Sequence, residues 1–211
     1  MIDLNIIMEK LLQKRQVFHS EADFQFALAW EIKESNRDIA IRLEKCIDKM
    51  YVDIIAEYNN KVIPIELKYK TRNTSNRIIN DNNEKFELKN QGAHDQARYD
   101  FIKDISRIEE LIGRDRFEFG YAIMLTNDHL YWENKAKENR TTVSDSFRIH
   151  DGRILEKNKV LDWSEKASEG TKKGRSSIIL KNEYTLNWNA YRTFDGNEFR
   201  YLIVKVHNSH Y

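Results

Sequence analysis

The stretch YVDIIAEYNNKVIPIELKYK, residues 51–70, has the pattern of two β-strands joined by a tight turn. Asn59–Asn60 separates two runs rich in β-branched and aromatic residues, which is typical of a hairpin with a two-residue turn. With this turn, Asp53 lies directly opposite Glu66 on the neighbouring strand. Like charges at directly opposed positions destabilise a sheet. The pairing therefore suggests that a positive group lies between the two carboxylates.

Alternation along the hairpin separates two faces. One is apolar and is expected to face the core, with Val52, Ile54, Ala56, Ile63, Ile65 and Leu67. The other carries Asp53, Glu66 and Lys68, and apolar residues near the turn indicate that it is partly covered. A covered pair of carboxylates needs compensation, because burying an unpaired charge is costly. Lys68 could complete a structural triad, or a divalent cation could bind both carboxylates; the spacing leaves both alternatives open.

Pro64 complicates this register. A proline within a strand indicates an edge strand or a bulge, and a bulge would shift Asp53 relative to Glu66. The local spacing of Glu66 and Lys68 does not depend on the register.

Composition sets broad limits on the 211-residue chain. Hydrophobic residues make up 40% and charged residues 33%, and 35 Lys and Arg balance 34 Asp and Glu. Net charge therefore says nothing about the partner. A single cysteine, Cys46, excludes an internal disulfide framework and is expected to be a small buried residue in a strand. We expect one soluble, cytoplasmic α/β domain spanning residues 1–211.

The sequence pattern argues against several classes of protein. The N-terminus forms an amphipathic helix instead of a signal peptide, and no apolar run is long enough to cross a membrane. The histidines show no metal-binding spacing, and nothing resembles a phosphate-binding glycine loop or a nucleophile elbow.

Periodicity predicts the order of elements along the chain. A helix begins after Ser20, which is expected to cap it with Asp23 at the third helical position. The further expected elements are a strand at 39–47, the hairpin, a polar loop at 71–92, a helix at 93–113 ending at Gly113, a buried strand at 117–127, weaker strands within 146–155 and 184–194, an exposed flexible loop at 164–177 and a final strand at 199–207.

An upstream helical Glu21, then Asp53, then Glu66-Leu67-Lys68 resembles the PD-(D/E)xK nuclease superfamily. The predicted order is also similar to the αβββαβ core of its restriction-endonuclease-like fold. The resemblance covers about residues 20–127. It implies an α/β fold with a mixed central sheet flanked by helices, followed by a β-rich C-terminal extension over about residues 128–211. The Pro-Asp dipeptide of the family is absent, because valine precedes Asp53.

The resemblance implies a metal-dependent nuclease that hydrolyses phosphodiester bonds of nucleic acid, DNA more than RNA, in restriction, defence or repair. Asp53, Glu66 and the carbonyl of Leu67 would hold Mg²⁺ or Mn²⁺. Lys68 would orient or help to deprotonate the attacking water. Glu21 would join the metal or its water shell, although a glutamate in a first helical turn is also favoured by the helix dipole.

Weaker candidates accompany this set. Gln96 and Tyr99 resemble a Gln-x-x-x-Tyr motif of some branches, one residue short, which gives Gln96 a supporting catalytic role. Residues expected to contact nucleic acid are Lys70, Arg72, Arg77, Tyr99, Lys103 and Arg107. The helical members of this set could instead form a solvated face, since Asp100 and Asp104 balance their charges.

Other functions stay open at this point. The fold could serve a non-catalytic nucleic-acid-binding or regulatory module, or the hairpin charges could be wholly structural. Because enzymes that cut both strands are often dimers, a homodimer is a further expectation, although no interface is evident in the sequence.

Overall fold

The computed structural model describes residues 2–73, 78–79, 83–134, 141–194 and 196–207. A six-stranded sheet lies at its centre, in the order β1-β2-β3-β6-β12-β11. Its strands are β1 (Ala40–Ile47), β2 (Met50–Tyr58), β3 (Lys61–Lys70), β6 (Phe119–Thr126), β11 (Trp188–Phe194) and β12 (Asn197–His207). β3 and β6 run parallel, and every other neighbouring pair is antiparallel. The sheet is therefore mixed, as expected.

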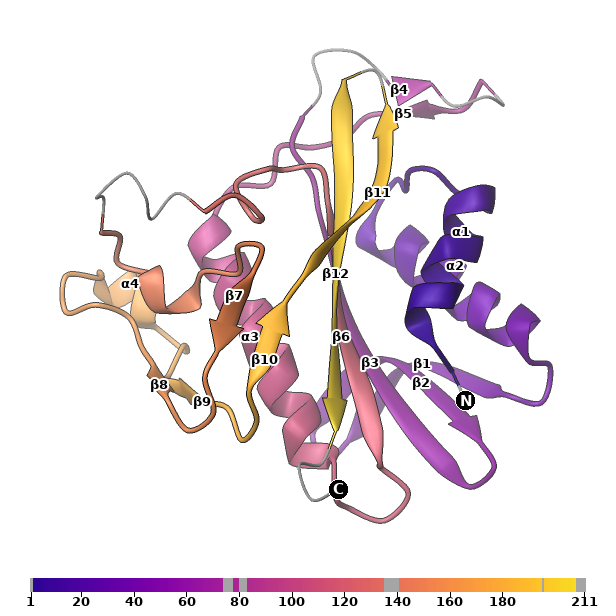
Figure 1. Cartoon of the computed structure of the whole chain (residues 1–211), viewed down its shortest axis with the longest axis horizontal. Helices are drawn as coiled ribbons and strands as arrows, with labels where there is room; N and C mark the ends of the chain where they lie inside the picture. The colour runs from indigo at the N-terminus through magenta and orange to yellow at the C-terminus, as the bar shows by residue number, and fades with distance from the viewer. Residues whose placement is uncertain (1, 74–77, 80–82, 135–140, 195, 208–211) are drawn as a thin grey trace.

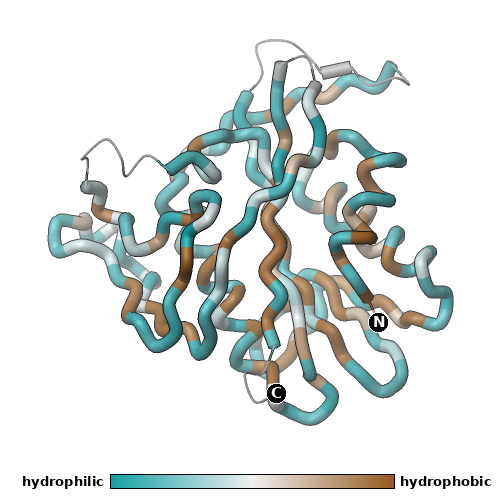
Figure 2. Tube along the Cα trace, viewed as in Figure 1, coloured by the Kyte–Doolittle hydropathy of each residue, from teal (hydrophilic) through white to brown (hydrophobic). Residues whose placement is uncertain are grey.

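Helices cover both faces of this sheet (Figure 1). α1 (Leu4–Lys14) and α2 (Glu21–Ser35) pack on one face. α3 (His94–Leu111) connects β3 to β6 and packs on the other. Alternate residues of β6 serve the two layers: Ile123 belongs to the α1–α2 core and Met124 to the α3 core. In Figure 2 the sheet strands carry the hydrophobic colour along much of their length. The prediction of a mixed α/β fold is confirmed.

The hairpin register is confirmed from the turn to Ile54 and Ile65; the ladder ends one pair short of Asp53 and Glu66. β2 and β3 pair from Tyr58 and Lys61 to Ile54 and Ile65 without a shift, through Pro64. Both turn asparagines have positive φ, as a two-residue turn of this kind requires. No bulge accompanies the proline, contrary to expectation. β3 lies inside the sheet, and its ladder with β6 begins at Ile65, so Pro64 removes no hydrogen bond from that ladder.

Gly120 makes room for Pro64 at this point. A Cβ atom at Gly120 would lie 2.8 Å from Pro64 Cγ and 2.6 Å from Ile108 Cγ2. Distances of this size are steric clashes, so the site needs a residue without a side chain. This close contact brings α3 directly against β3 and β6.

Local signals place the helix ends correctly. The Ser20 side chain accepts a hydrogen bond from the backbone N–H of Asp23 at 3.1 Å, and α2 begins at Glu21. The predicted helix at 93–113 ends as α3 at Leu111, and Gly113 follows with φ 91°. These caps supply partners for backbone groups that helix termini leave unpaired.

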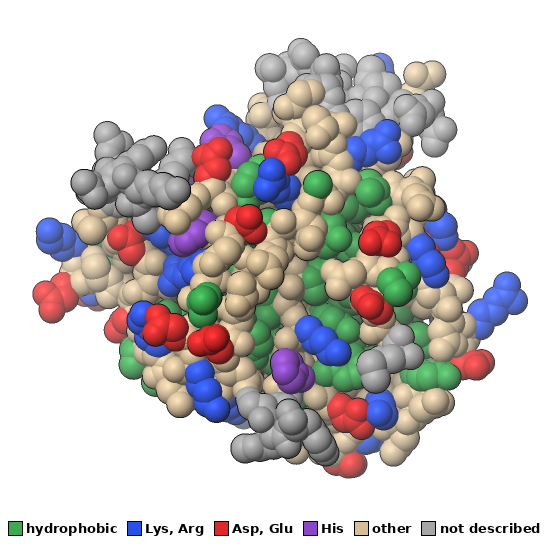
Figure 3. All heavy atoms as spheres, in the orientation of Figure 1, with side chains coloured by type: hydrophobic (Ala, Val, Ile, Leu, Met, Phe, Trp, Pro, Cys, Tyr) green, Lys and Arg blue, Asp and Glu red, His purple; other side chains and the backbone are tan. Residues whose placement is uncertain are grey.

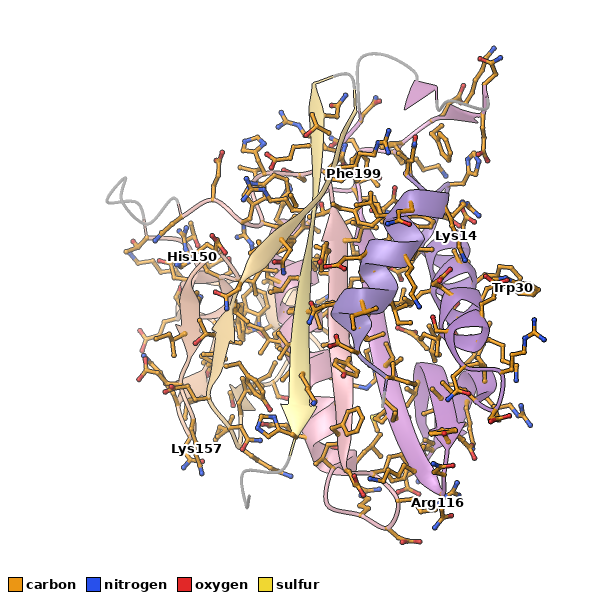
Figure 4. All side chains as sticks on the ribbon, turned by 45° about the vertical axis from the view of Figure 1, so that its right-hand side comes forward. Lys14, Trp30, Arg116, His150, Lys157 and Phe199 are labelled. Atoms are coloured by element: carbon orange, nitrogen blue, oxygen red, sulfur yellow. The ribbon has the colours of Figure 1, made fainter. Side chains whose placement is uncertain are left out.

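The C-terminal part contributes to the central sheet, because β12 pairs with β6 on one side and β11 on the other. Phe199 of β12, labelled in Figure 4, is buried in the α1–α2 core. Smaller elements of this part are η2 (Asp145–Phe147), β7 (Arg153–Leu155), β8 (Val160–Leu161), α4 (Glu169–Lys172), β9 (Ile178–Ile179) and β10 (Tyr184–Leu186). β7 pairs with β10, and β8 with β9, beside α3.

Four local expectations need correction. Cys46 is exposed, because β1 is the edge strand. Val52, expected on the face of the hairpin with Ile54, packs instead with Ile55 on the α3 side. The regular alternation of β1 and β2 is interrupted at Glu44, which lies opposite Asp53 and has a positive φ. The polar segment at 71–92 contains β4 (Ile78–Ile79) paired with β5 (Lys85–Phe86). The segment at 164–177 contains α4 and a buried Ala167.

Among the described residues, no helix combines the length and apolar character needed to cross a bilayer.

Candidate active site

The two strands of the hairpin separate beyond Ile54 and Ile65, and this opens one edge of β3. Two carboxylates bind the backbone along this edge. Asp53 Oδ2 accepts a hydrogen bond from Leu67 N, and Glu21 Oε2 accepts one from Tyr69 N, each at 2.7 Å. Alternate residues of a strand are about 7 Å apart, so the two acceptor oxygens lie roughly that far from each other. The first turn of α2 and the end of β2 therefore meet at β3.

Glu66 lies beside Asp53 and is only 2% exposed. The two carboxyl groups are close enough for each to shift the pKa of the other. Burial, together with the charges of Asp104 and Asp53, raises the pKa of Glu66 to about 9. Burial also raises the pKa of Asp53, although the hydrogen bond from Leu67 N opposes this. At neutral pH the pair therefore holds a proton on Glu66.

Lys68 extends from the same strand toward α3. Its Nζ lies 2.7 Å from Asp104 Oδ2 and donates to the carbonyl of Leu67 at 3.3 Å. Burial lowers the pKa of this amine, but the nearby carboxylates, Asp104 first, outweigh burial and raise it. Lys68 is therefore protonated at neutral pH.

Arg107, one turn after Asp104 on α3, contacts both Asp104 and Glu66. Its NH1 lies 3.1 Å from Asp104 Oδ1, and its NH2 lies 3.1 Å from Glu66 Oε1. The same NH2 donates to the carbonyl of Tyr51. Despite its proximity, the guanidinium does not reach Glu66 Oε1 in a hydrogen-bonding geometry, and this buried oxygen has no hydrogen-bond partner among the described residues.

A cleft of about 710 Å³ opens in front of this cluster. Its lining residues, from β1, β2, β3, the turn between β1 and β2, and α3, are Glu44, Lys49, Met50, Tyr51, Asp53, Lys68, Asp100, Lys103, Asp104, Arg107 and Glu110. Of the predicted catalytic residues, Asp53 and Lys68 reach its wall; of those predicted to contact nucleic acid, Lys103 and Arg107 do. The cleft is large enough to admit a phosphodiester group.

The donor atoms fit a hard divalent cation. Two carboxylates, Asp53 and Glu66, and one main-chain carbonyl, that of Leu67, lie together, and Mg²⁺ is commonly held by one or two carboxylates with waters and substrate phosphates. No hydrogen bond from the described residues satisfies Glu66 Oε1, although Arg107 NH2 lies 3.1 Å away. In the described part of the chain, no three His, Cys, Asp or Glu side chains form a metal-binding group. Glu21, bonded to Tyr69 N and 3.9 Å from Lys70, is not brought into a ligand set.

A second hollow, of about 680 Å³, lies between α1 and α2 and is lined by Lys14 and Trp30, both labelled in Figure 4. Its two carboxylates, Glu31 and Glu34, are each 2.7 Å from Lys14. Because its carboxylates are paired with Lys14 and it lies on the opposite face of the sheet, this hollow is not part of the site.

The structure separates the weaker candidates. Gln96 accepts a hydrogen bond from Arg175 at 2.9 Å and does not line the cleft. Tyr99 is 1% exposed; it donates to the carbonyl of Ser176 and packs on Phe147, so it belongs to the core and presents no surface to nucleic acid.

The basic candidates are placed differently from one another. Lys103 lines the cleft and lies 6.0 Å from the Tyr99 ring centre. Arg107 is engaged within the ion cluster. Arg72 is exposed, and its backbone N–H binds Asn127. Arg77 lies outside the described residues. Figure 3 shows acidic and basic side chains interspersed on one face of the molecule, in keeping with the balanced composition.

Asp104 is the site residue that the sequence did not reveal. Its i, i+3 relation to Arg107 was visible, but the same charges suit a solvated helix face equally well. Only the packing of α3 against β3 turns this residue inward, to 4% exposure beside Lys68.

No protein-family model, curated protein or solved structure matches this chain.

Proposed function

We propose that this protein is a metal-dependent phosphodiesterase that cleaves nucleic acid, with DNA as the first substrate to test and a restriction, defence or repair role. The observation that carries the proposal is the group formed by Asp53, Glu66 and Lys68 at the open end of the hairpin, beside the cleft. Two carboxylates with a lysine suit phosphoryl chemistry, because the reaction develops negative charge around a phosphate. Support for the restriction-endonuclease-like fold comes from the order of elements around the mixed sheet.

Each residue has a distinct part in this proposal. Asp53, Glu66 and the carbonyl of Leu67 would hold Mg²⁺ or Mn²⁺, which supplies a more acidic bound water and stabilises charge on the phosphate. The protonated Lys68 orients the water and counters phosphate charge, because a lysine in this form cannot accept a proton. Lys103 at the cleft wall and Lys70 nearby would contact the backbone of the nucleic acid.

A second candidate function is a nucleic-acid-binding or regulatory module without catalysis. It is favoured by the pairing of the acidic groups with resident cations: Asp104 with Lys68, and Glu66 with Arg107. The charges of such a cluster are balanced without a metal ion. In that case nucleic acid would bind and would not be cut.

The test is incubation with circular DNA, linear DNA and RNA, in Mg²⁺ or Mn²⁺ and in EDTA. We expect metal-dependent cleavage that falls at least about 100-fold in Asp53→Asn and Lys68→Met. Lys61→Met is the matched control, since Lys61 lies at the turn end of the same strand and pairs with Glu118 at the surface. Binding without cleavage by the wild type would favour the second candidate. Equal cleavage in EDTA, or by Lys68→Met, would reject the first.

A further inference from the structure

Asp104, on α3, contacts the amine of Lys68 at the wall of the cleft. The 2.7 Å contact between Lys68 Nζ and Asp104 Oδ2 joins two side chains that are 17% and 5% exposed. We propose that Asp104 is the positioning residue for Lys68, so that α3 determines the position of the Lys68 amine. The inference rests on the proposed nuclease function and adds a residue that lies outside the Asp, Glu-x-Lys pattern.

Lysine needs such a partner. Its ammonium is a compact charge on a flexible four-carbon stem, and holding it at one point costs side-chain entropy. A small displacement of a catalytic group can slow a reaction by about 100-fold. Asp104 supplies a negative charge that is fixed on a helix; its Oδ2 forms no hydrogen bond among the described residues, so its contact with Lys68 is an ion pair. The position of Asp104 is set by the close packing of Ile108, one turn later, against Gly120.

Asp104 is itself oriented by a second contact. Its Oδ1 lies 3.1 Å from Arg107, so its two oxygens face different cations and the carboxylate plane is restrained. Arg107 is in turn held by the carbonyl of Tyr51 and lies next to Glu66. The chain of contacts links Lys68 to Glu66 through α3, which fixes the two site residues relative to each other.

Asp104→Asn separates positioning from general stability. Asparagine keeps the size of the side chain and one acceptor oxygen but removes the charge. We expect the single-turnover cleavage rate to fall about 10- to 100-fold, while KM and the affinity for Mn²⁺ change by less than about threefold. Asp104→Glu should recover part of the rate. Asp95→Asn is the control, because Asp95 lies in the first turn of the same helix and is not among the residues that line the cleft.

A second readout does not depend on cleavage. Acetylation of lysines by a water-soluble active ester, followed residue by residue with mass spectrometry, reports how firmly the Lys68 amine is held. We expect Lys68 to react at least about tenfold faster in Asp104→Asn than in the wild type, with no change in Asp95→Asn.

The outcomes distinguish the two proposals. Unchanged labelling of Lys68, or unchanged cleavage by Asp104→Asn, would overturn the positioning role. Loss of Mn²⁺ binding in proportion to cleavage would also overturn it, because Asp104 would then act through the metal ligands. If the wild type cleaves nothing while labelling rises in the variant, the ion pair exists and the nuclease function fails.

Discussion

Two buried carboxylates on the same helix have contrasting surroundings. Glu109 is 3% exposed, and its two oxygens accept hydrogen bonds from the backbone N–H groups of Lys181 and Asn182, the side-chain amide of Asn182 and the hydroxyl of Tyr184. Asp104, about one and a half turns earlier, is equally buried but faces Lys68 and Arg107 beside a cleft. Both are acidic residues in the core, yet one is enclosed by neutral donors and the other by charges.

The difference separates a structural group from a functional one. Glu109 anchors the segment between β9 and β10 onto α3, and its four donors come from that one segment. A buried carboxylate with this many donors is a complete hydrogen-bonding arrangement. Asp104 instead belongs to a cluster in which several charges share a small space, and such clusters are frequent at active sites. The predictions below test whether this distinction holds.

The largest effect on stability is expected from Glu109→Ala. The side-chain amide of Asn182 also donates to the carbonyl of His207, so the removal leaves three of the four donors unpaired, the N–H groups of Lys181 and Asn182 and the hydroxyl of Tyr184, at about 1–3 kcal/mol for each buried unsatisfied group. We expect a loss of about 3 kcal/mol or more in the free energy of unfolding, measured by urea denaturation with tyrosine and tryptophan fluorescence. Asp104→Asn should cost less, about 1 kcal/mol, because Lys68 is 17% exposed and keeps the charge of Asp53 and the carbonyl of Leu67 as partners. Equal losses in the two variants would remove the distinction.

A smaller effect is expected in the pH dependence of stability. The pKa of Glu66 rises from its ordinary 4.5 to about 9 on folding. Between these values the folded state binds the proton more tightly than the unfolded state, so the free energy of unfolding decreases as pH rises from about 5 to 9. In Glu66→Gln the neutral amide needs no proton, and this decrease should be smaller by about 2 kcal/mol or more. The measurement is urea denaturation in EDTA at pH 5, 7 and 9. Parallel pH profiles for the two proteins would contradict a raised pKa of Glu66.

Local rules predicted much of the hairpin and the helix ends. A two-residue asparagine turn sets the register that places Asp53 next to Glu66, and Ser20 caps α2 where Glu21 begins it. These features depend on neighbours within a few positions in the chain. The order of helices and strands around the mixed sheet followed from periodicity for the same reason.

Features that depend on distant packing could not be predicted. Tyr99 is buried because η2 and the segment near Trp163 cover a second side of α3, which otherwise has one apolar stripe facing the sheet. Cys46 is exposed because its strand ends the sheet. Asp104 is turned inward because α3 crosses from β3 to β6 and lies against Pro64 and Gly120. None of these contacts produces a recognisable pattern among residues that are close in the sequence.

The most direct test of the metal site is calorimetry with Mn²⁺ and Mg²⁺ on the wild type and on Asp53→Ala. We predict one bound ion per chain, at least about tenfold weaker binding in the variant, and retention in Asp48→Ala, an exposed carboxylate on the turn between β1 and β2. Release of the Glu66 proton should make the measured heat depend on the buffer. A folded wild type that binds neither ion, with or without DNA, would contradict the account and leave Asp53, Glu66 and Lys68 as a structural ion cluster.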